Sequence, residues 1–167
     1  LLAVMALCSC SNNTSSSSLS PSSSSSANSS NTSTSSVLNG YFEREDEEGN
    51  LYKGNFVNGE YDGYGVMEYI TGTIYEGTWS EGKWEGSCKI TWDSGCVYIG
   101  EAHDGAMHGI GYMIWPMGDY YYGDWRNGSP NGAGTKYYMV DSTAEDVQHQ
   151  YNIYTGDMKN NLKVGKG

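Results

Sequence analysis

The sequence repeats itself at a fixed interval, and this repeat restricts the chain to a narrow set of architectures. A Tyr-x-Gly element occurs at intervals of 23 residues and once more after 33 residues, beginning at Tyr52, Tyr75, Tyr98, Tyr121 and Tyr154. Further glycines and aromatic residues keep the same register in each unit. Repeats of this length build arrays of one supersecondary unit, each stabilised by its neighbours, rather than one globular core.

The order of side chains within each unit predicts a β-hairpin. Tyr52, Gly54 and Phe56 share a parity, so one face of the first strand carries the aromatics and glycines. Asn58-Gly59 is a turn dipeptide that tolerates positive φ, and Gly63, four residues further on, predicts a loop longer than two residues. The glycines within strands leave room for an aromatic ring from the neighbouring strand. Because a single hairpin is marginal, we expect an all-β fold in which the hairpins stack into an elongated single-layer antiparallel sheet.

This pattern resembles a known repeat family. The consensus Y-x-G-x-[W/F]-x-x-G-x-x-x-G-x-G-x-x-x-[Y/W]-x-x-G is similar to the MORN (membrane occupation and recognition nexus) repeat, and it covers the chain from about Asn50 to Gly167. The resemblance implies the hairpin array and a scaffolding, dimerising, membrane-associating or enzyme-appended module. The chain departs from the consensus at Cys88, Ala102, Asp141 and Asn161, where we expect the sheet to be locally looser.

The repeat divides the chain into segments. We expect a truncated signal peptide with a lipobox-like end at 1–10, a Ser/Asn/Thr-rich disordered linker at 11–37 and a repeat array at 38–167, which comprises a half unit (39–49), full units (50–72, 73–95, 96–118 and 119–141), an insertion (142–151) and a partial unit (152–167). In the insertion, a Ser/Thr pair followed by Glu145 and Asp146 predicts a short helix or a bulging loop.

The first residues indicate an exported protein with a lipid anchor. Leu7-Cys8-Ser9-Cys10 resembles the lipobox of bacterial lipoproteins, and Cys10 is the predicted lipidation site, since Leu7 is a poor small residue before a cleavage site at Cys8. A signal peptide without lipidation and the tail of a transmembrane helix are the alternatives. The uncharged linker would then hold the folded part away from the membrane. The predicted location is the bacterial cell envelope, on the outer surface or in the periplasm.

The charge balance narrows the class of partner. The formal net charge is −11, from 20 acidic and 9 basic residues. Nucleic acids and anionic lipids both bind through clusters of Lys and Arg, and the sequence has no basic stripe. The balance therefore argues against nucleic acid and against electrostatic adsorption to a membrane.

The residue types that usually carry chemistry do not form a site in the sequence. His103, His108 and His149 are the candidate metal ligands. The first two flank a turn, but the further ligands that a structural metal needs are lacking. The acidic run at 43–48 lacks the spacing of a calcium loop. Cys88 and Cys96 are expected to lie too far apart for a disulfide. No nucleophile and base can be grouped, so we predict a protein that is not an enzyme and needs no cofactor or metal.

The aromatic face remains the candidate binding site. The rings either hold a one-layer sheet together or stay accessible as a contact surface, and they are Tyr52, Phe56, Tyr75, Trp79, Trp92, Tyr98, Trp115, Tyr121 and Trp125. The leading hypothesis is a non-catalytic scaffold that binds a protein partner or itself. The alternatives are an envelope glycan binder that uses the aromatic face, and an accessory region of a larger enzyme.

Overall fold

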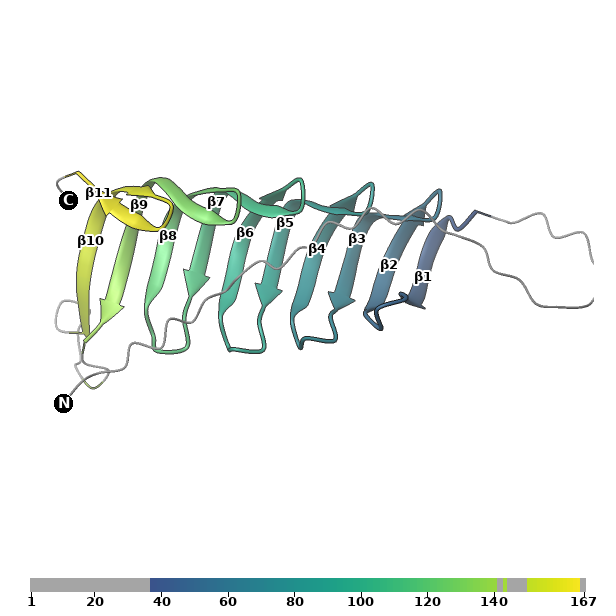
Figure 1. Cartoon of the computed structure of the whole chain (residues 1–167), viewed down its shortest axis with the longest axis horizontal. Helices are drawn as coiled ribbons and strands as arrows, with labels where there is room; N and C mark the ends of the chain where they lie inside the picture. The colour runs from purple at the N-terminus through teal and green to yellow at the C-terminus, as the bar shows by residue number, and fades with distance from the viewer. Residues whose placement is uncertain (1–36, 141–142, 144–149, 166–167) are drawn as a thin grey trace, which may run out of the picture.

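The chain forms one open antiparallel sheet of 11 strands that follow each other in sequence order (Figure 1). The computed structural model describes residues 37–140, 143 and 150–165. The strands are β1 (Gly40–Glu45), β2 (Leu51–Val57), β3 (Glu60–Glu68), β4 (Ile74–Ser80), β5 (Lys83–Thr91), β6 (Val97–His103), β7 (Ala106–Ile114), β8 (Tyr120–Arg126), β9 (Ser129–Met139), β10 (Tyr151–Lys159) and β11 (Leu162–Val164). The predicted all-β, single-layer sheet of stacked hairpins is confirmed.

The hairpin tips close through two-residue turns. Asn58 and Gly59 have φ values of 53° and 86°, and the corresponding pairs in the following units also have positive φ at both positions. Two successive positive φ values define the type I′ turn, whose twist matches that of paired strands. The prediction of a longer loop is therefore wrong. Gly63, with φ of 86°, lies instead within β3, where the register with β2 shifts between Gly54 and Phe56.

A row of glycines crosses the sheet from strand to strand. The paired positions are Phe42, Gly54, Gly65, Gly77, Cys88, Gly100, Gly111, Gly123, Gly134 and Gly156. The Tyr52 ring lies over two of them, because a Cβ added to Gly54 or Gly65 would come within 2.6 Å of that ring. The sequence predicts a ring from the neighbouring strand. In the structure the ring covers one glycine of its own strand, Gly54, and one of the neighbouring strand, Gly65. Each missing side chain makes room for a buried tyrosine.

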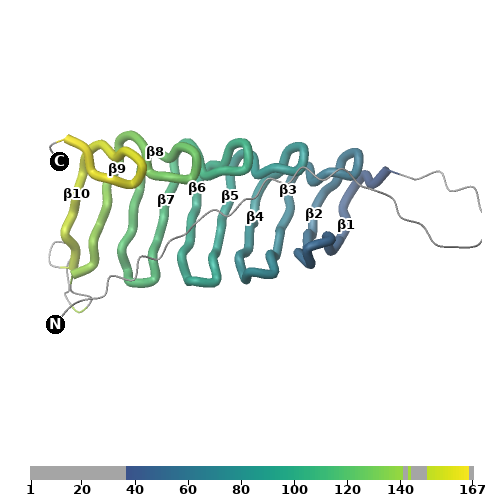
Figure 2. Tube along the Cα trace, in the orientation of Figure 1, coloured from purple at the N-terminus to yellow at the C-terminus, as the bar shows by residue number. Residues whose placement is uncertain are grey.

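Each hairpin bends where its register shifts, so that its tip curls over one face of the sheet, called here the inner face (Figure 2). The bend leaves a carbonyl without a ladder partner, and the Tyr52 hydroxyl donates to it at Asn55 O over 3.1 Å. Tyr75, Tyr98, Tyr121 and Tyr154 make the equivalent bond. The curled tips bury Tyr52, Tyr75, Tyr98 and Tyr121 completely. Each of these tyrosines therefore fills the core with its ring and pairs the carbonyl at the bend with its hydroxyl.

The second unit accommodates its departure from the pattern without a break in the sheet. Cys88 replaces a glycine in the row, and the Tyr75 hydroxyl lies against its thiol. The Tyr75 ring stacks on Trp84, with centroids 4.7 Å apart and planes 12° apart. Strands β4 and β5 stay paired on both sides of the register shift, so the expected loosening at Cys88 is wrong. Ala102, the corresponding departure in the third unit, is buried.

Several predicted features lie outside the described residues. They are the signal segment with Cys10, the linker up to residue 36, Asp141 and most of the insertion, including Glu145 and Asp146. Within the part of the chain that the structure covers, no helix has the length and apolar character that a membrane span requires.

Candidate functional site

The predicted aromatic binding residues are mostly core residues. Seven of the nine rings are buried beneath the curled hairpin tips: Tyr52, Phe56, Tyr75, Trp79, Tyr98, Tyr121 and Trp125. Trp92 and Trp115 are partly buried and line the inner face at the ends of the strands that lie away from the hairpin tips. The structure thus places the seven in a packing role, and a binding role for Trp92 and Trp115 stays a prediction.

The other face of the sheet, called here the outer face, has no covering layer among the described residues. Side chains alternate between faces along each strand, so the residues between the buried tyrosines and glycines point to this side. From β6 to β10 it carries the exposed side chains Ile99, Ile110, Ile114, Tyr122 and Ile153 and the half-buried Val97, Tyr112, Tyr120 and Tyr137. We call this set of nine residues the outer apolar patch. Monomeric soluble proteins rarely expose a continuous apolar area of this kind without a function.

Comparison of two matched positions shows that the fold does not require apolar side chains at them. The position of Ile99 and Tyr122 in the third and fourth units is occupied by Lys53 and Glu76 in the first two. The position of Ile114 and Tyr137 is likewise occupied by Glu68 and Thr91. Every unit forms the same paired strands, so charged and apolar side chains serve the fold equally well at these positions.

In the first two units the outer face satisfies its own polar groups. Lys53 Nζ lies 3.0 Å from Glu68 Oε1, and the Tyr64 hydroxyl donates to Glu76 Oε1 over 2.7 Å. Such exposed pairs contribute little stability, but they keep these polar groups paired at the surface. The outer face of the first two units therefore mixes polar pairs with the exposed Tyr64 and Ile74, whereas apolar side chains dominate from β6 onward.

Tyrosine rings pack against each other in the part of the outer apolar patch that lies nearest the C-terminal strands. The Tyr120 ring stacks on Tyr137, with centroids 4.1 Å apart, and on Tyr112, with centroids 5.5 Å apart, while Tyr151 meets it edge-on. These contacts between neighbouring strands link the rings into one aromatic cluster on the outer face. Burial raises the pKa of Tyr120 to about 12, which keeps its hydroxyl neutral at physiological pH.

A shallow hollow of about 380 Å³ lies within this region. Its walls are Ile110, Tyr122, Asp124, Thr135 and Thr155, and its floor includes glycines of the row. A protruding apolar side chain of a partner would fit such a hollow, whereas it offers no enclosure for catalysis.

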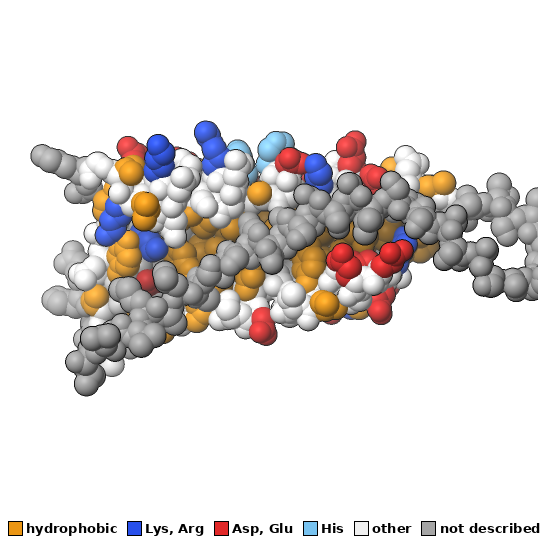
Figure 3. Space-filling view, viewed as in Figure 1, with side chains coloured by type: hydrophobic (Ala, Val, Ile, Leu, Met, Phe, Trp, Pro, Cys, Tyr) orange, Lys and Arg blue, Asp and Glu red, His pale blue; other side chains and the backbone are white. Residues whose placement is uncertain are grey.

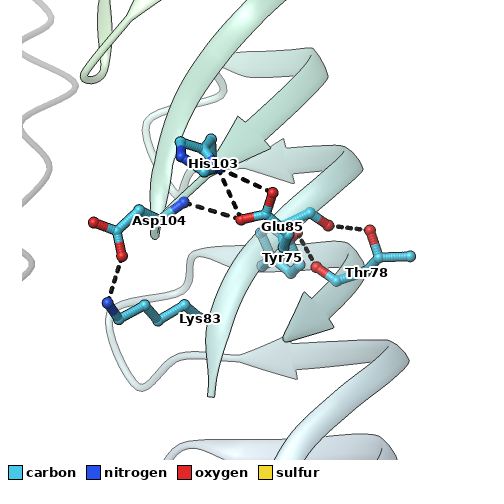
Figure 4. Close-up of polar contacts among 6 residues, drawn as sticks. All are labelled: Tyr75, Thr78, Lys83, Glu85, His103 and Asp104. Carbon is cyan, nitrogen blue, oxygen red and sulfur yellow. Dashed lines mark hydrogen bonds and ion pairs between the residues drawn. The ribbon is translucent and has the colours of Figure 1, made fainter. Parts of the chain in front are cut away.

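His103, a candidate metal ligand, lies with three other titratable side chains on adjacent hairpin tips (Figure 4). His103 Nδ1 lies 3.0 and 3.1 Å from the two carboxylate oxygens of Glu85, and Lys83 pairs with Asp104. The hydrogen bond from His103 lowers the pKa of Glu85, and Glu85 in turn raises the pKa of His103. All four side chains are solvent-accessible, so the group forms a surface ion-pair cluster between adjacent tips.

The structure assigns no metal centre or disulfide to the remaining candidates. Across the described ranges, no group of three or more His, Cys, Asp or Glu side chains could hold a metal ion. His149 lies outside those ranges. Cys88 and Cys96 are buried and are not joined to each other, and burial raises the pKa of the Cys88 thiol to about 12. That thiol is therefore protonated and a poor nucleophile.

Sequence reasoning missed the outer apolar patch because it followed the aromatic columns of the repeat. Those columns are strict because they form the core. The signal for the patch lies in the positions between them, where the residue type varies from unit to unit and changes from charged to apolar along the chain.

The chain was compared with known protein families. The model of the MORN repeat matches it at residues 52–74, 75–97, 98–120, 121–139 and 154–167, which together exceed half of the chain. Repeats of this type are non-catalytic modules that generally bind or scaffold. The search of curated proteins finds no match.

Proposed function

The chain belongs to the MORN repeat family, and we propose that it is a non-catalytic scaffold whose outer apolar patch binds a protein partner or a second copy of itself. The observation that carries the proposal is the change at two matched positions of the outer face, where Lys53, Glu76, Glu68 and Thr91 of the first two units give way to Ile99, Tyr122, Ile114 and Tyr137 in the next two. Because the fold tolerates either type at these positions, the apolar residues there are explained by contact rather than by stability.

The chemistry of the patch favours protein over lipid or nucleic acid. The carboxylates Asp124 and Asp157 line the hollow beside Ile110, and the whole chain has a net charge of −11. Anionic membranes and nucleic acids would be repelled by this arrangement. Aromatic and aliphatic side chains at the centre with polar groups around them are the usual composition of a protein interface.

The size of the patch predicts a weak or transient contact. Five strands spaced about 4.8 Å apart, and about six residues of about 3.3 Å each, give a footprint of roughly 500 Å². Stable complexes bury about 800 Å² on each partner. Binding through this patch alone is therefore expected at the weak end, and several molecules side by side on a surface would strengthen it through avidity.

Two matched variants test the proposal. Ile110→Asp places a charge within the patch, and Ser87→Asp places the same charge at the same position of the preceding unit. We expect Ile110→Asp to abolish self-association in sedimentation velocity, or retention of a partner from envelope extract, while Ser87→Asp leaves it intact. Equal behaviour of the two variants, with both folded, would refute a role for the patch.

The envelope location is part of the same proposal and depends on Cys10. Its support is the lipobox-like sequence Leu7-Cys8-Ser9-Cys10 followed by a Ser-rich segment. Cys10→Ser should move the protein from the membrane fraction to the soluble fraction and prevent labelling with a fatty-acid probe. Cys8→Ser is the control and should retain both properties. Membrane retention of the Cys10→Ser protein would contradict the lipid anchor.

A further inference from the structure

Two lysines interrupt the apolar positions of the inner face at the C-terminal end of the sheet. In the row of the core tyrosines, Lys136 occupies the position held by Met67, Ile90 and Met113 on the other second strands. Lys163 occupies the hairpin-tip position held elsewhere by Tyr61, Trp84, Met107 and Pro130. In the view of Figure 3, basic side chains gather near this end of the molecule and acidic ones near the other.

Aromatic rings hold the two ammonium groups near each other. Lys136 Nζ lies 4.5 Å from the centroid of Trp115 and 5.3 Å from that of Tyr138. Lys163 Nζ lies 4.4 Å from the same Tyr138 ring and 4.9 Å from Tyr154. Both cations therefore contact the same Tyr138 ring, and these contacts restrict their positions.

The two positive charges are only partly compensated in the unbound protein. Burial lowers the pKa of Lys136, the charge of Lys163 lowers it further, and the Asp119 carboxylate opposes the shift. Asp119 Oδ1 already accepts a hydrogen bond from the Met139 backbone. None of the ion pairs among the described residues includes Lys136 or Lys163. Since methionine serves the fold at the matched positions Met113 and Met107, the fold itself gives no reason for two cations here.

The geometry points to a binding site for an acidic polysaccharide on the inner face, in which Lys136 and Lys163 bind the carboxylate of one sugar and the neighbouring rings contact the sugar chain. Two ammonium groups and Asp119 sum to one net positive charge, which matches a singly charged carboxylate better than a dianionic phosphate. This site lies on the face opposite the outer apolar patch and does not depend on the proposed scaffold function.

The spacing of the rings favours a sugar chain that runs across the strands. Trp92, Trp115 and Tyr138 recur once per hairpin, that is, every two strands, or about 9.4–9.8 Å. This distance is close to one disaccharide of an extended glycan, whose C–H faces pack against aromatic rings. An extended peptide would need partners for its backbone groups. The strands of this face already use theirs in the sheet ladder, so a peptide is the poorer occupant.

Binding of hyaluronan octasaccharide, which carries one carboxylate per disaccharide, tests the site in a calorimetric or NMR titration of the whole chain. Each of Lys136→Met and Lys163→Met should weaken binding about tenfold or more, as expected for the loss of a charge-assisted hydrogen bond. Lys89→Met, on the outer face of β5, is the matched control and should have no effect. Neutral chitohexaose should bind more weakly than hyaluronan.

Each other outcome would overturn the inference. These outcomes are absence of hyaluronan binding at millimolar concentration, binding that Lys136→Met and Lys163→Met leave unchanged, and equal binding of poly-glutamate, which would assign the site to acidic peptides. Circular dichroism establishes that the variants are folded. Ile110→Asp should leave hyaluronan binding intact, and Lys136→Met should leave protein association intact, so failure of one proposal is separable from failure of the other.

Discussion

Replacement of Gly111 by alanine is a sensitive test of the packing that holds each hairpin together. Gly111 is paired with Gly100 and lies under the Tyr98 ring, and a Cβ at this position would come within 2.6 Å of that ring. Its φ is not in the positive range, so alanine is compatible with the backbone. Chain entropy alone would then make Gly111→Ala stabilising by about 0.4–1 kcal/mol. The packing argument predicts the opposite sign.

The expected loss follows from what Tyr98 does. Its side chain is fully buried, and its hydroxyl donates to Glu101 O over 2.8 Å and to His108 O over 3.3 Å. Displacing a well-packed ring costs about 1–3 kcal/mol. A buried carbonyl left without its donor costs about 1–3 kcal/mol more. We therefore expect Gly111→Ala to lower the free energy of unfolding by about 2–6 kcal/mol in urea titrations followed by tryptophan fluorescence and circular dichroism.

Two further variants distinguish the clash from other effects of losing a glycine. Gly105 has φ of 77° and open space around its Cα, so Gly105→Ala measures backbone strain without a clash. In a Tyr98→Ala background the ring is absent, and Gly111→Ala should then cost nothing. If Gly111→Ala leaves stability unchanged or raises it, the ring-over-glycine account is refuted.

Other predictions use matched positions in the same way. Trp125 Nε1 donates to Gly111 O over 3.1 Å, whereas the buried Trp79 Nε1 has no hydrogen-bond partner among the described residues, so Trp125→Phe should cost about 1–3 kcal/mol more than Trp79→Phe in urea unfolding. The raised pKa of His103 and the lowered pKa of Glu85 mean that their ion pair is complete between the ordinary values of 4.5 and 6.5; its stabilisation is lost as pH falls through the Glu85 pKa or rises through the His103 pKa. Glu85→Gln should return the His103 NMR titration midpoint towards 6.5, and an unmoved midpoint would contradict the contact. Burial raises the pKa of Tyr121 from 10.0 to about 12, so stability should fall as pH rises from about 10 to 12, because the unfolded chain loses this proton first; circular dichroism that stays constant across that range would oppose this.

Some features were predictable because they depend on residues close together in one unit. The 23-residue period, the parity of Tyr52, Gly54 and Phe56, and the Asn58-Gly59 turn together predict stacked hairpins. Turn chemistry and strand alternation act over two to four residues, so the sequence shows them directly. The wrong loop length at Gly63 has a related cause, since a positive-φ glycine serves a turn or a bend within a strand equally well.

The sequence by itself determined the unit and the direction of stacking. Only the tertiary structure decided which residues are accessible. The bends curl each tip over the inner face, so the aromatic rings that dominate the sequence become core and the less regular residues between them become surface. The structure also brings Lys136 and Lys163 to the same Tyr138 ring, although they lie on either side of the insertion. Burial and convergence depend on contacts between distant segments, and no local pattern of residue types encodes those contacts.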